Sequence, residues 1–257
     1  MMIDIKDDLR QSVVIAKNEI TKYIRGRKLL VFIIIEVLIL AVLSAIPYIF
    51  GDSYPDGMTV VTTFIAIYLL LIELSVVLFA ATAIVSEFED RTALVLFTKP
   101  VNKWAIYVGK LAASMALVFL LGMIYLVYIM VFSQLATGEV VPGFGTSFLL
   151  TLCAVFGLCG LAMMFSSFAK KGSTAIIMTL IMILLFLDLI AGLLSTFAEI
   201  PPWWCLSDAV DYVILAFGPY GGVSATSEEI LRAAGVMIVW GVATNVLGFL
   251  LFKKRDF

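Results

Sequence analysis

Six long apolar stretches constrain this chain more than any other feature of its sequence. Each is long enough to cross the hydrocarbon core of a bilayer, which takes about 20 helical residues. Hydrophobic residues make up 63% of the chain and charged residues 14%, which is too little polar surface for a water-soluble domain of this length. The sequence therefore predicts an all-α, polytopic membrane protein with six transmembrane helices. The predicted spans cover residues 29–50, 60–85, 111–135, 146–168, 174–197 and 233–252.

The positions of the basic residues predict how these spans are oriented. Loops on the cytoplasmic side of a membrane are enriched in Lys and Arg. Of the 17 Lys and Arg residues, all except Arg232 lie in the segments 1–28, 86–110, 169–173 and 253–257. We therefore expect both termini in the cytoplasm. The basic clusters are interpreted as determinants of topology, and no nucleic acid is expected as a partner.

Residues 1–28 are predicted to form an amphipathic helix along the cytoplasmic surface of the membrane. They are too polar for a cleavable signal peptide, so the first span is expected to stay in the product. Apolar residues recur in them at helical spacing and are accompanied by Lys and Arg, which is typical of an interfacial helix. A disordered N-terminal segment is the alternative. The apolar stripe consists of Leu9, Val13, Ala16, Ile20 and Tyr23.

The rest of the chain, 29–257, is predicted to form one transmembrane domain with a helical segment outside the membrane at 198–232. Trp203 and Trp204 suit the membrane interface. The apolar run 209–217 is too short to span, so a re-entrant or surface-lying helix is expected there. Thr226 and Glu229 have the spacing of a capping box that starts the last helix near Ser227.

Several kinds of catalytic and ligand site are excluded by residue type. The chain has no His, which excludes Ser-His triads and the zinc motifs that need two His. Cys153 and Cys159 would leave different faces of one helix and Cys205 stands apart, so we expect neither a disulfide nor a metal site. The Gly-x-x-x-x-Gly-Lys-[Ser/Thr] phosphate loop and the Gly-x-Ser-x-Gly nucleophile elbow do not occur. A membrane-embedded enzyme is therefore a weak interpretation.

The predicted cytoplasmic loop 86–110 is longer and more patterned than a simple connection requires. Charged residues crowd the end of the second span, a short apolar helix is expected over 92–97, and Pro100 suits the first turn of the following helix. Leu94, Leu96 and Phe97 form an apolar patch framed by charge. This composition is typical of a docking surface. A passive loop is the alternative.

This loop resembles the cytoplasmic signature of the ABC-2 type transporter permeases, in which acidic residues and a Thr precede a Pro-Val pair and a later Lys. Asn102 and Lys103 stand where many members have Ser-Arg. The six spans, the leading helix and the outer helical segment also fit, so the resemblance covers nearly the whole chain. The residues that carry it in the loop are Glu87, Glu89, Thr92, Lys99, Pro100, Val101, Lys103, Gly109 and Lys110.

The resemblance implies a membrane subunit whose motor is a separate protein. It implies an exporter in the plasma (inner) membrane of a prokaryote, built from two copies of this permease or from this chain and a homologous one. A separate ABC ATPase subunit beneath each would hold ATP and Mg²⁺, and Glu87 to Thr98 would form the coupling helix that sits in an ATPase cleft. The implied coupling residues are Glu87, Phe88, Glu89, Asp90, Arg91, Thr92, Leu94, Phe97, Lys99 and Pro100.

Three acids, Glu36, Glu73 and Asp188, fall inside predicted spans. An intramembrane carboxyl is a candidate functional group because its charged form is costly there. The helical rise places Glu36 about 10 Å from the cytoplasmic edge, Glu73 about 18 Å and Asp188 about 21 Å, so the last two are expected at a similar level. Each acid either ties helices together in its neutral form or contacts the transported substrate.

Two other functions stay open on the residues alone. A secondary transporter or channel would use the three intramembrane acids directly with ions. A scaffold that transmits mechanical work without passing a substrate would instead bind an extracytoplasmic partner at the segment 201–227.

Overall fold

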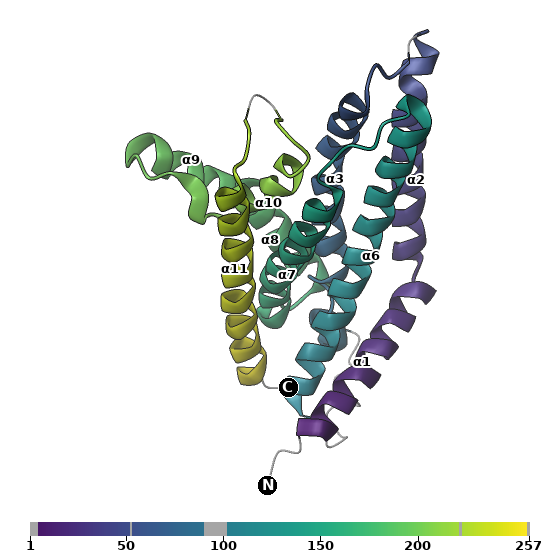
Figure 1. Ribbon diagram of the computed structural model, residues 1–257. Helices are drawn as coiled ribbons and strands as arrows, with labels where there is room; N and C mark the ends of the chain where they lie inside the picture. Colours follow the sequence, from purple (N-terminus) through teal and green to yellow (C-terminus); the bar gives the residue numbers. More distant parts are fainter. Residues whose placement is uncertain (1–4, 52, 90–101, 221–222, 256–257) are drawn as a thin grey trace.

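The computed structural model describes residues 5–51, 53–89, 102–220 and 223–255, and these form a helical bundle (Figure 1). Apart from one isolated bridge between Tyr220 and Val223, the described residues contain no strand pairing. Six helical segments are long and apolar enough to cross a membrane, which confirms the predicted fold class. They are α2 (Arg27–Ile49), α3 (Gly57–Phe79), α6 (Lys103–Thr137), α7 (Phe144–Phe168), the continuous segment Gly172–Phe197, and α11 (Ser227–Lys254).

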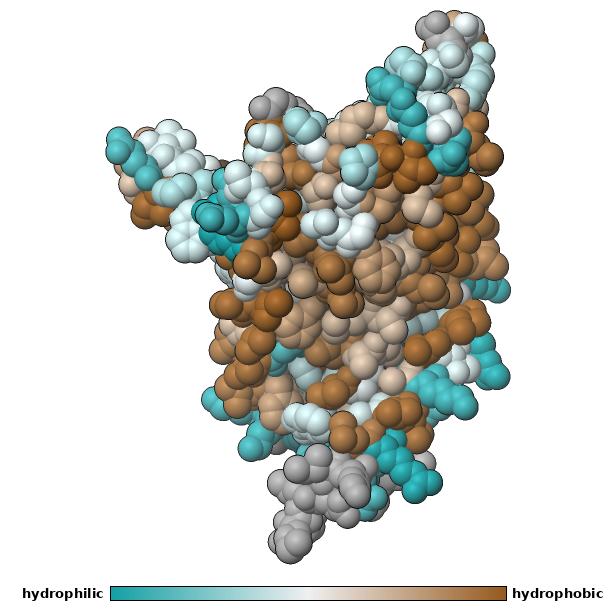
Figure 2. All heavy atoms as spheres, in the orientation of Figure 1, coloured by the Kyte–Doolittle hydropathy of each residue, from teal (hydrophilic) through white to brown (hydrophobic). Residues whose placement is uncertain are grey.

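The bundle is organised around α3 and α7, which are the most buried of the six. α2 is the least buried, and most of its surface is apolar and exposed, as a bilayer requires. Figure 2 shows apolar side chains across the middle of the molecule and hydrophilic ones toward its two ends. α11 packs closely on α7 because glycines face the contact: a Cβ on Gly248 would lie 3.0 Å from the Cα of Met164.

The N-terminal helix α1 (Ile5–Arg25) packs along α6 at the end of the bundle where both termini lie (Figure 1). The approach is close, since a Cβ on Gly109 would lie 2.6 Å from the carbonyl oxygen of Ser12. The face of α1 that is buried carries Ser12, Glu19 and Tyr23. It overlaps the C-terminal part of the expected apolar stripe, because Tyr23 is buried and Ala16 and Ile20 are partly buried against the core. Leu9 and Val13, the first two stripe residues, stay outside and are 49% and 68% exposed.

The second span ends earlier than predicted. We expected it to reach residue 85, but α3 ends at Phe79, a turn follows over 80–84, and a short helix, α4, occupies Val85–Glu89. The cause is a tertiary contact from α7: the Ser166 hydroxyl accepts hydrogen bonds from the backbone N–H of Ile84 at 3.0 Å and of Val85 at 3.1 Å.

The fifth span is irregular. α8 (Gly172–Ile181) is followed by five residues of π-helix, η1 (Met182–Phe186), and then by α9 (Leu187–Phe197). Figure 1 shows α9 turning away from the bundle. A π-helical turn inside a span is a common place for a helix to bend.

The outer segment contains the short 3-10 helix η2 (Pro202–Trp204) and the helix α10 (Leu206–Leu215), which begins three residues before the expected run. α10 buries Leu206, Ala209, Val210 and Val213, and its main neighbours are α7 and α11. The capping box at Thr226 and Glu229 is confirmed, and α11 begins directly after it.

Candidate functional site

The described start of the loop 86–110 is α4, and its residues Val85–Glu89 are called the coupling root below. The rest of the proposed coupling helix lies outside the described residues. That part includes Asp90, Arg91, Thr92, Leu94 and Phe97, and the remaining implied coupling residues, Lys99 and Pro100, also lie outside the described residues. Three side chains of the coupling root, those of Glu87, Phe88 and Glu89, contact different elements at this end of the bundle.

A buried cation joins the coupling root to α1 and α6. The Lys110 side chain on α6 is 2% exposed, and its Nζ lies 2.8 Å from Glu19 Oε2 on α1 and 2.9 Å from Glu87 Oε1 on α4. Lys22, on the outer side, places its Nζ 3.4 Å from the same Glu87 oxygen and 3.1 Å from Ser86 Oγ. A buried charge is tolerated only when it is paired and hydrogen-bonded, so these contacts fix the position of Glu87.

Glu89 joins the coupling root to α8. Its Oε2 accepts a hydrogen bond at 2.8 Å from the backbone N–H of Gly172, the first residue of α8. Lys171, at the N-cap of α8, makes no side-chain cap bond of its own. A carboxylate at this place satisfies a free N–H and complements the positive end of the helix. Glu89 thus caps the fifth span from outside.

Phe88 joins the coupling root to the C-terminal end of α11. Its ring lies under the Arg255 guanidinium, whose central carbon is 3.7 Å from the ring centroid, and edge-on to Phe252. Burial lowers the pKa of Arg255 from its ordinary value, and a guanidinium stays charged nonetheless. Arg255 also donates a hydrogen bond to the backbone carbonyl of Ser167, on α7.

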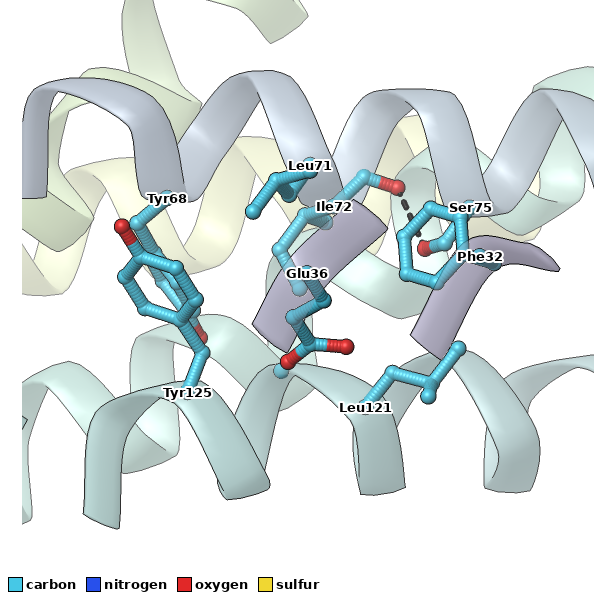
Figure 3. A pocket seen from close by; sticks show the side chains of 9 residues that line it. Phe32, Glu36, Tyr68, Leu71, Ile72, Ser75, Leu121 and Tyr125 are labelled. Atoms are coloured by element: carbon cyan, nitrogen blue, oxygen red, sulfur yellow. Dashed lines mark hydrogen bonds between the residues drawn. The ribbon is translucent and has the colours of Figure 1, made fainter. Parts of the chain in front are cut away.

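Glu36, on α2, lies in a small cavity between α3 and α6 (Figure 3). The residue is 3% exposed, and its Oε1 has no hydrogen-bond partner among the described residues. The neighbouring hydroxyls are engaged elsewhere: that of Tyr68 with Thr151, and that of Tyr125 with the carbonyl of Phe64. The cavity measures about 10 Å³, which is room for about one water molecule. In this conformation the site has no space for a substrate.

The other two intramembrane acids, Glu73 and Asp188, lie on different helices, and Asp188 is exposed. Glu73, on α3, lies within electrostatic range of Asp188 at the start of α9 and of Asp211 on α10. Part of Asp211 is open to solvent, yet protein surrounds much of its carboxyl. Burial first, and then Asp188 and Asp208, raise the pKa of Asp211 to about 6. Over the described ranges, no group of three or more His, Cys, Asp or Glu side chains is placed to hold a metal ion.

Sequence reasoning missed three residues of these sites. Glu19 was not singled out, because only its pairing with Lys110, 91 positions away, distinguishes it from other charges of α1. Asp208 and Asp211 lie in the outer segment, where acidic residues are common and did not mark a site. Lys110 was noted as part of the loop motif, but its burial between two carboxylates was not anticipated.

One comparison with known proteins bears on this arrangement. The family model described as "ABC-2 family transporter protein" matches residues 13–257, from within α1 through all six spans. A search of curated proteins finds no match to the chain. Because the family match covers far more than half of the chain and the six apolar helices are present, the chain belongs to the ABC-2 family of transporter membrane proteins.

Proposed function

We propose that this permease is the membrane half of an exporter that works as a dimer and is driven by two separate ATPase subunits bound at the loop 86–110. ATP and Mg²⁺ would be held by those subunits. The observation that carries the proposal is the coupling root. Its five residues contact α1 and α6 through Glu87, α8 through Glu89, and α11 through Phe88.

These contacts suggest how work done on the loop reaches the spans. Closure of the ATPase subunits would displace residues 90–101, and the coupling root would pass the displacement on. Glu89 holds the first N–H of α8, so α8 would follow, and the π-helical turn at Met182–Phe186 is where that span would bend. Two alternative arrangements of the bundle, biased by ATP, are sufficient for export.

The orientation follows from the same end of the molecule. Both described termini lie at one end of the bundle (Figure 1). The two described residues that flank 90–101 contact other elements: Asn102 donates a hydrogen bond to Asp8 on α1, and Glu89 accepts one from Gly172 at the start of α8. All Lys and Arg residues except Arg232 fall in the sequence segments 1–28, 86–110, 169–173 and 253–257. The proposal therefore places this end in the cytoplasm of a prokaryote and the permease in its inner membrane.

The test is co-purification of the tagged permease with its ATPase, followed by ATP turnover in vesicles. Phe97→Asp and Arg91→Ala alter the loop beyond the coupling root, and both are expected to lose the bound ATPase while the permease stays monodisperse. Val140→Asp is the matched control, because Val140 is 62% exposed in the opposite connection between α6 and α7. If both loop variants retain the ATPase and its turnover, the docking proposal is wrong.

Glu73 and Asp188 lie within electrostatic range of each other, which supports a second, compatible proposal, that these acids line the pathway. Glu73→Gln and Asp188→Asn keep the shape and remove the charge. Loss of transport with unchanged thermal stability would support the pathway, and unchanged transport in both would reject it. Ion flux through the permease alone, in vesicles without ATPase, would instead favour a secondary transporter or channel.

A further inference from the structure

A cavity of about 310 Å³ lies at the elbow where α1 passes into α2. This size is within the range of small-molecule sites. Three cations line it, Lys22, Arg27 and Lys28. We call this cavity the elbow pocket.

The elbow pocket is positively charged and its cations are available. Its one acidic lining residue, Glu19, is already engaged by Lys110 at 2.8 Å. Arg27 and Lys28 are exposed, and in the described part of the chain neither forms an ion pair. Lys22 keeps 46% of its side chain exposed despite its two carboxylate neighbours. Three cations therefore line the cavity against one carboxylate, Glu19, whose Oε2 is bound by Lys110 and whose Oε1 lies 3.9 Å from Lys22.

Backbone groups add to this field. Gly26 lines the pocket and is the N-cap residue of α2, where no side chain caps the helix. The first N–H groups of a 23-residue helix thus begin at the pocket, together with the positive end of the helix. Helix N-termini flanked by Lys and Arg bind phosphate groups. The chemistry that fits is a phosphate anion.

The apolar lining residues of the pocket indicate the source of that phosphate. Leu78, Phe79 and Tyr23 give this part of the lining its apolar character. Arg27 is the first residue of the first span, and Leu30 and Val31, on the next turn, are 61% and 52% exposed. A phosphate held at the elbow would continue into acyl chains along α2. We propose that the elbow pocket binds the phosphate headgroup of an anionic lipid from the leaflet at this end of the bundle.

The site would also act on the coupling root, a consequence that rests on the proposed function. Lys22 lines the pocket and also contacts Glu87 at 3.4 Å and Ser86 at 3.1 Å. A lipid phosphate would compete with Glu87 and Ser86 for Lys22. ATP turnover of the assembled transporter is therefore expected to change with the content of anionic lipid.

Binding is tested on the permease alone, so its result does not depend on ATPase coupling. The measurement is the association of spin-labelled phosphatidylglycerol, relative to spin-labelled phosphatidylcholine, in phosphatidylcholine bilayers that contain the permease. The variant Arg27→Gln/Lys28→Gln is expected to weaken the preference for phosphatidylglycerol about 25-fold, since each cation contributes about five-fold. The control Lys17→Gln/Arg25→Gln removes the same charge from exposed positions of α1 that do not line the pocket, and a change within about two-fold is expected.

Each outcome decides between the sources of the anion. Equal losses in the two double variants would overturn the pocket and leave only general surface attraction. Displacement of the labelled lipid by an excess of inorganic phosphate or glycerol phosphate would overturn the lipid assignment in favour of a soluble anion. Retained preference in Arg27→Gln/Lys28→Gln would overturn the proposal altogether. Because both side chains are exposed, an unchanged unfolding temperature is expected to accompany the loss of binding.

Discussion

Removal of Lys110 should destabilise the permease far more than removal of Lys22, although both cations contact Glu87. The side chains of Lys110 and Glu19 are 2% and 6% exposed, so Lys110→Met removes the cation 2.8 Å from the buried Glu19 carboxylate and leaves it Lys22, whose Nζ lies 3.9 Å from the other carboxylate oxygen. Breaking such a pair from one side costs about 3–5 kcal/mol of unfolding free energy. Lys22→Met is the matched control, because the Lys22 side chain is 46% exposed and its loss costs at most about 1 kcal/mol.

The assay is equilibrium unfolding of the purified permease in mixed detergent micelles, followed by circular dichroism. The variants Glu19→Gln and Glu19→Gln/Lys110→Met complete a double-mutant cycle. The double variant is expected to lose less unfolding free energy than the sum of the losses in Glu19→Gln and Lys110→Met, by at least about 1 kcal/mol. Glu87 keeps Lys22 in that variant. If Lys110→Met is no less stable than Lys22→Met, or if the double variant shows only the additive loss, the buried ion pair does not hold α1 on α6 as described.

Three further predictions concern other contacts of the same framework. Gly109→Ala should lose about 1–3 kcal/mol of unfolding free energy, because its Cβ would meet the Ser12 backbone of α1, whereas Gly235→Ala, with nothing within 4 Å, should be neutral or stabilising in the same unfolding assay. Glu89→Ala should cost about 1 kcal/mol through the lost cap of α8, and Glu89→Gln, which keeps an acceptor oxygen, should recover most of it; equal losses would contradict the cap. Asp211 has a pKa raised to about 6 when folded, so its contribution to stability is full below the ordinary Asp pKa of 3.8 and is lost as the pH rises through about 6. Asp211→Asn should therefore be more stable than the parent at pH 7, by less than about 1 kcal/mol because the residue is partly exposed, and equal to it near pH 4; a difference independent of pH, or the same difference in the control Glu228→Gln, would refute this.

The spans were predictable because a bilayer imposes a length and a composition that a single sequence displays directly. The start of α11 was predictable for a similar reason, since the capping box of Thr226 and Glu229 acts within four residues. The end of α3 was not predictable. Residues 80–85 are apolar enough to continue the span, and the hydrogen bonds that Ile84 and Val85 donate to the Ser166 hydroxyl involve a residue of α7 that is distant in the sequence.

The candidate site was predictable in kind and only partly in detail. The loop 86–110 was located by its charge, its apolar patch and its motif, and Glu87 and Glu89 were named among its residues. The partners of these acids come from elements far along the chain: Lys22, Lys110 and the N–H of Gly172. The buried face of α1 was predicted in part: Tyr23 of the apolar stripe is buried, whereas the burial of Glu19 depends on its ion pair with Lys110 of α6.

The central claim is that an ATPase binds the loop that starts at the coupling root. Cysteine cross-linking in membrane vesicles tests it most directly, with Cys153, Cys159 and Cys205 first replaced by Ala or Ser. A thiol introduced as Phe97→Cys is expected to be joined to the ATPase by a thiol-reactive cross-linker, with a yield that changes with ATP. The same reagent on Val140→Cys, at the opposite end, is expected to give no product with the ATPase. Cross-linking of position 97 only to other positions of the permease itself, or equal cross-linking of position 140 to the ATPase, would contradict the claim.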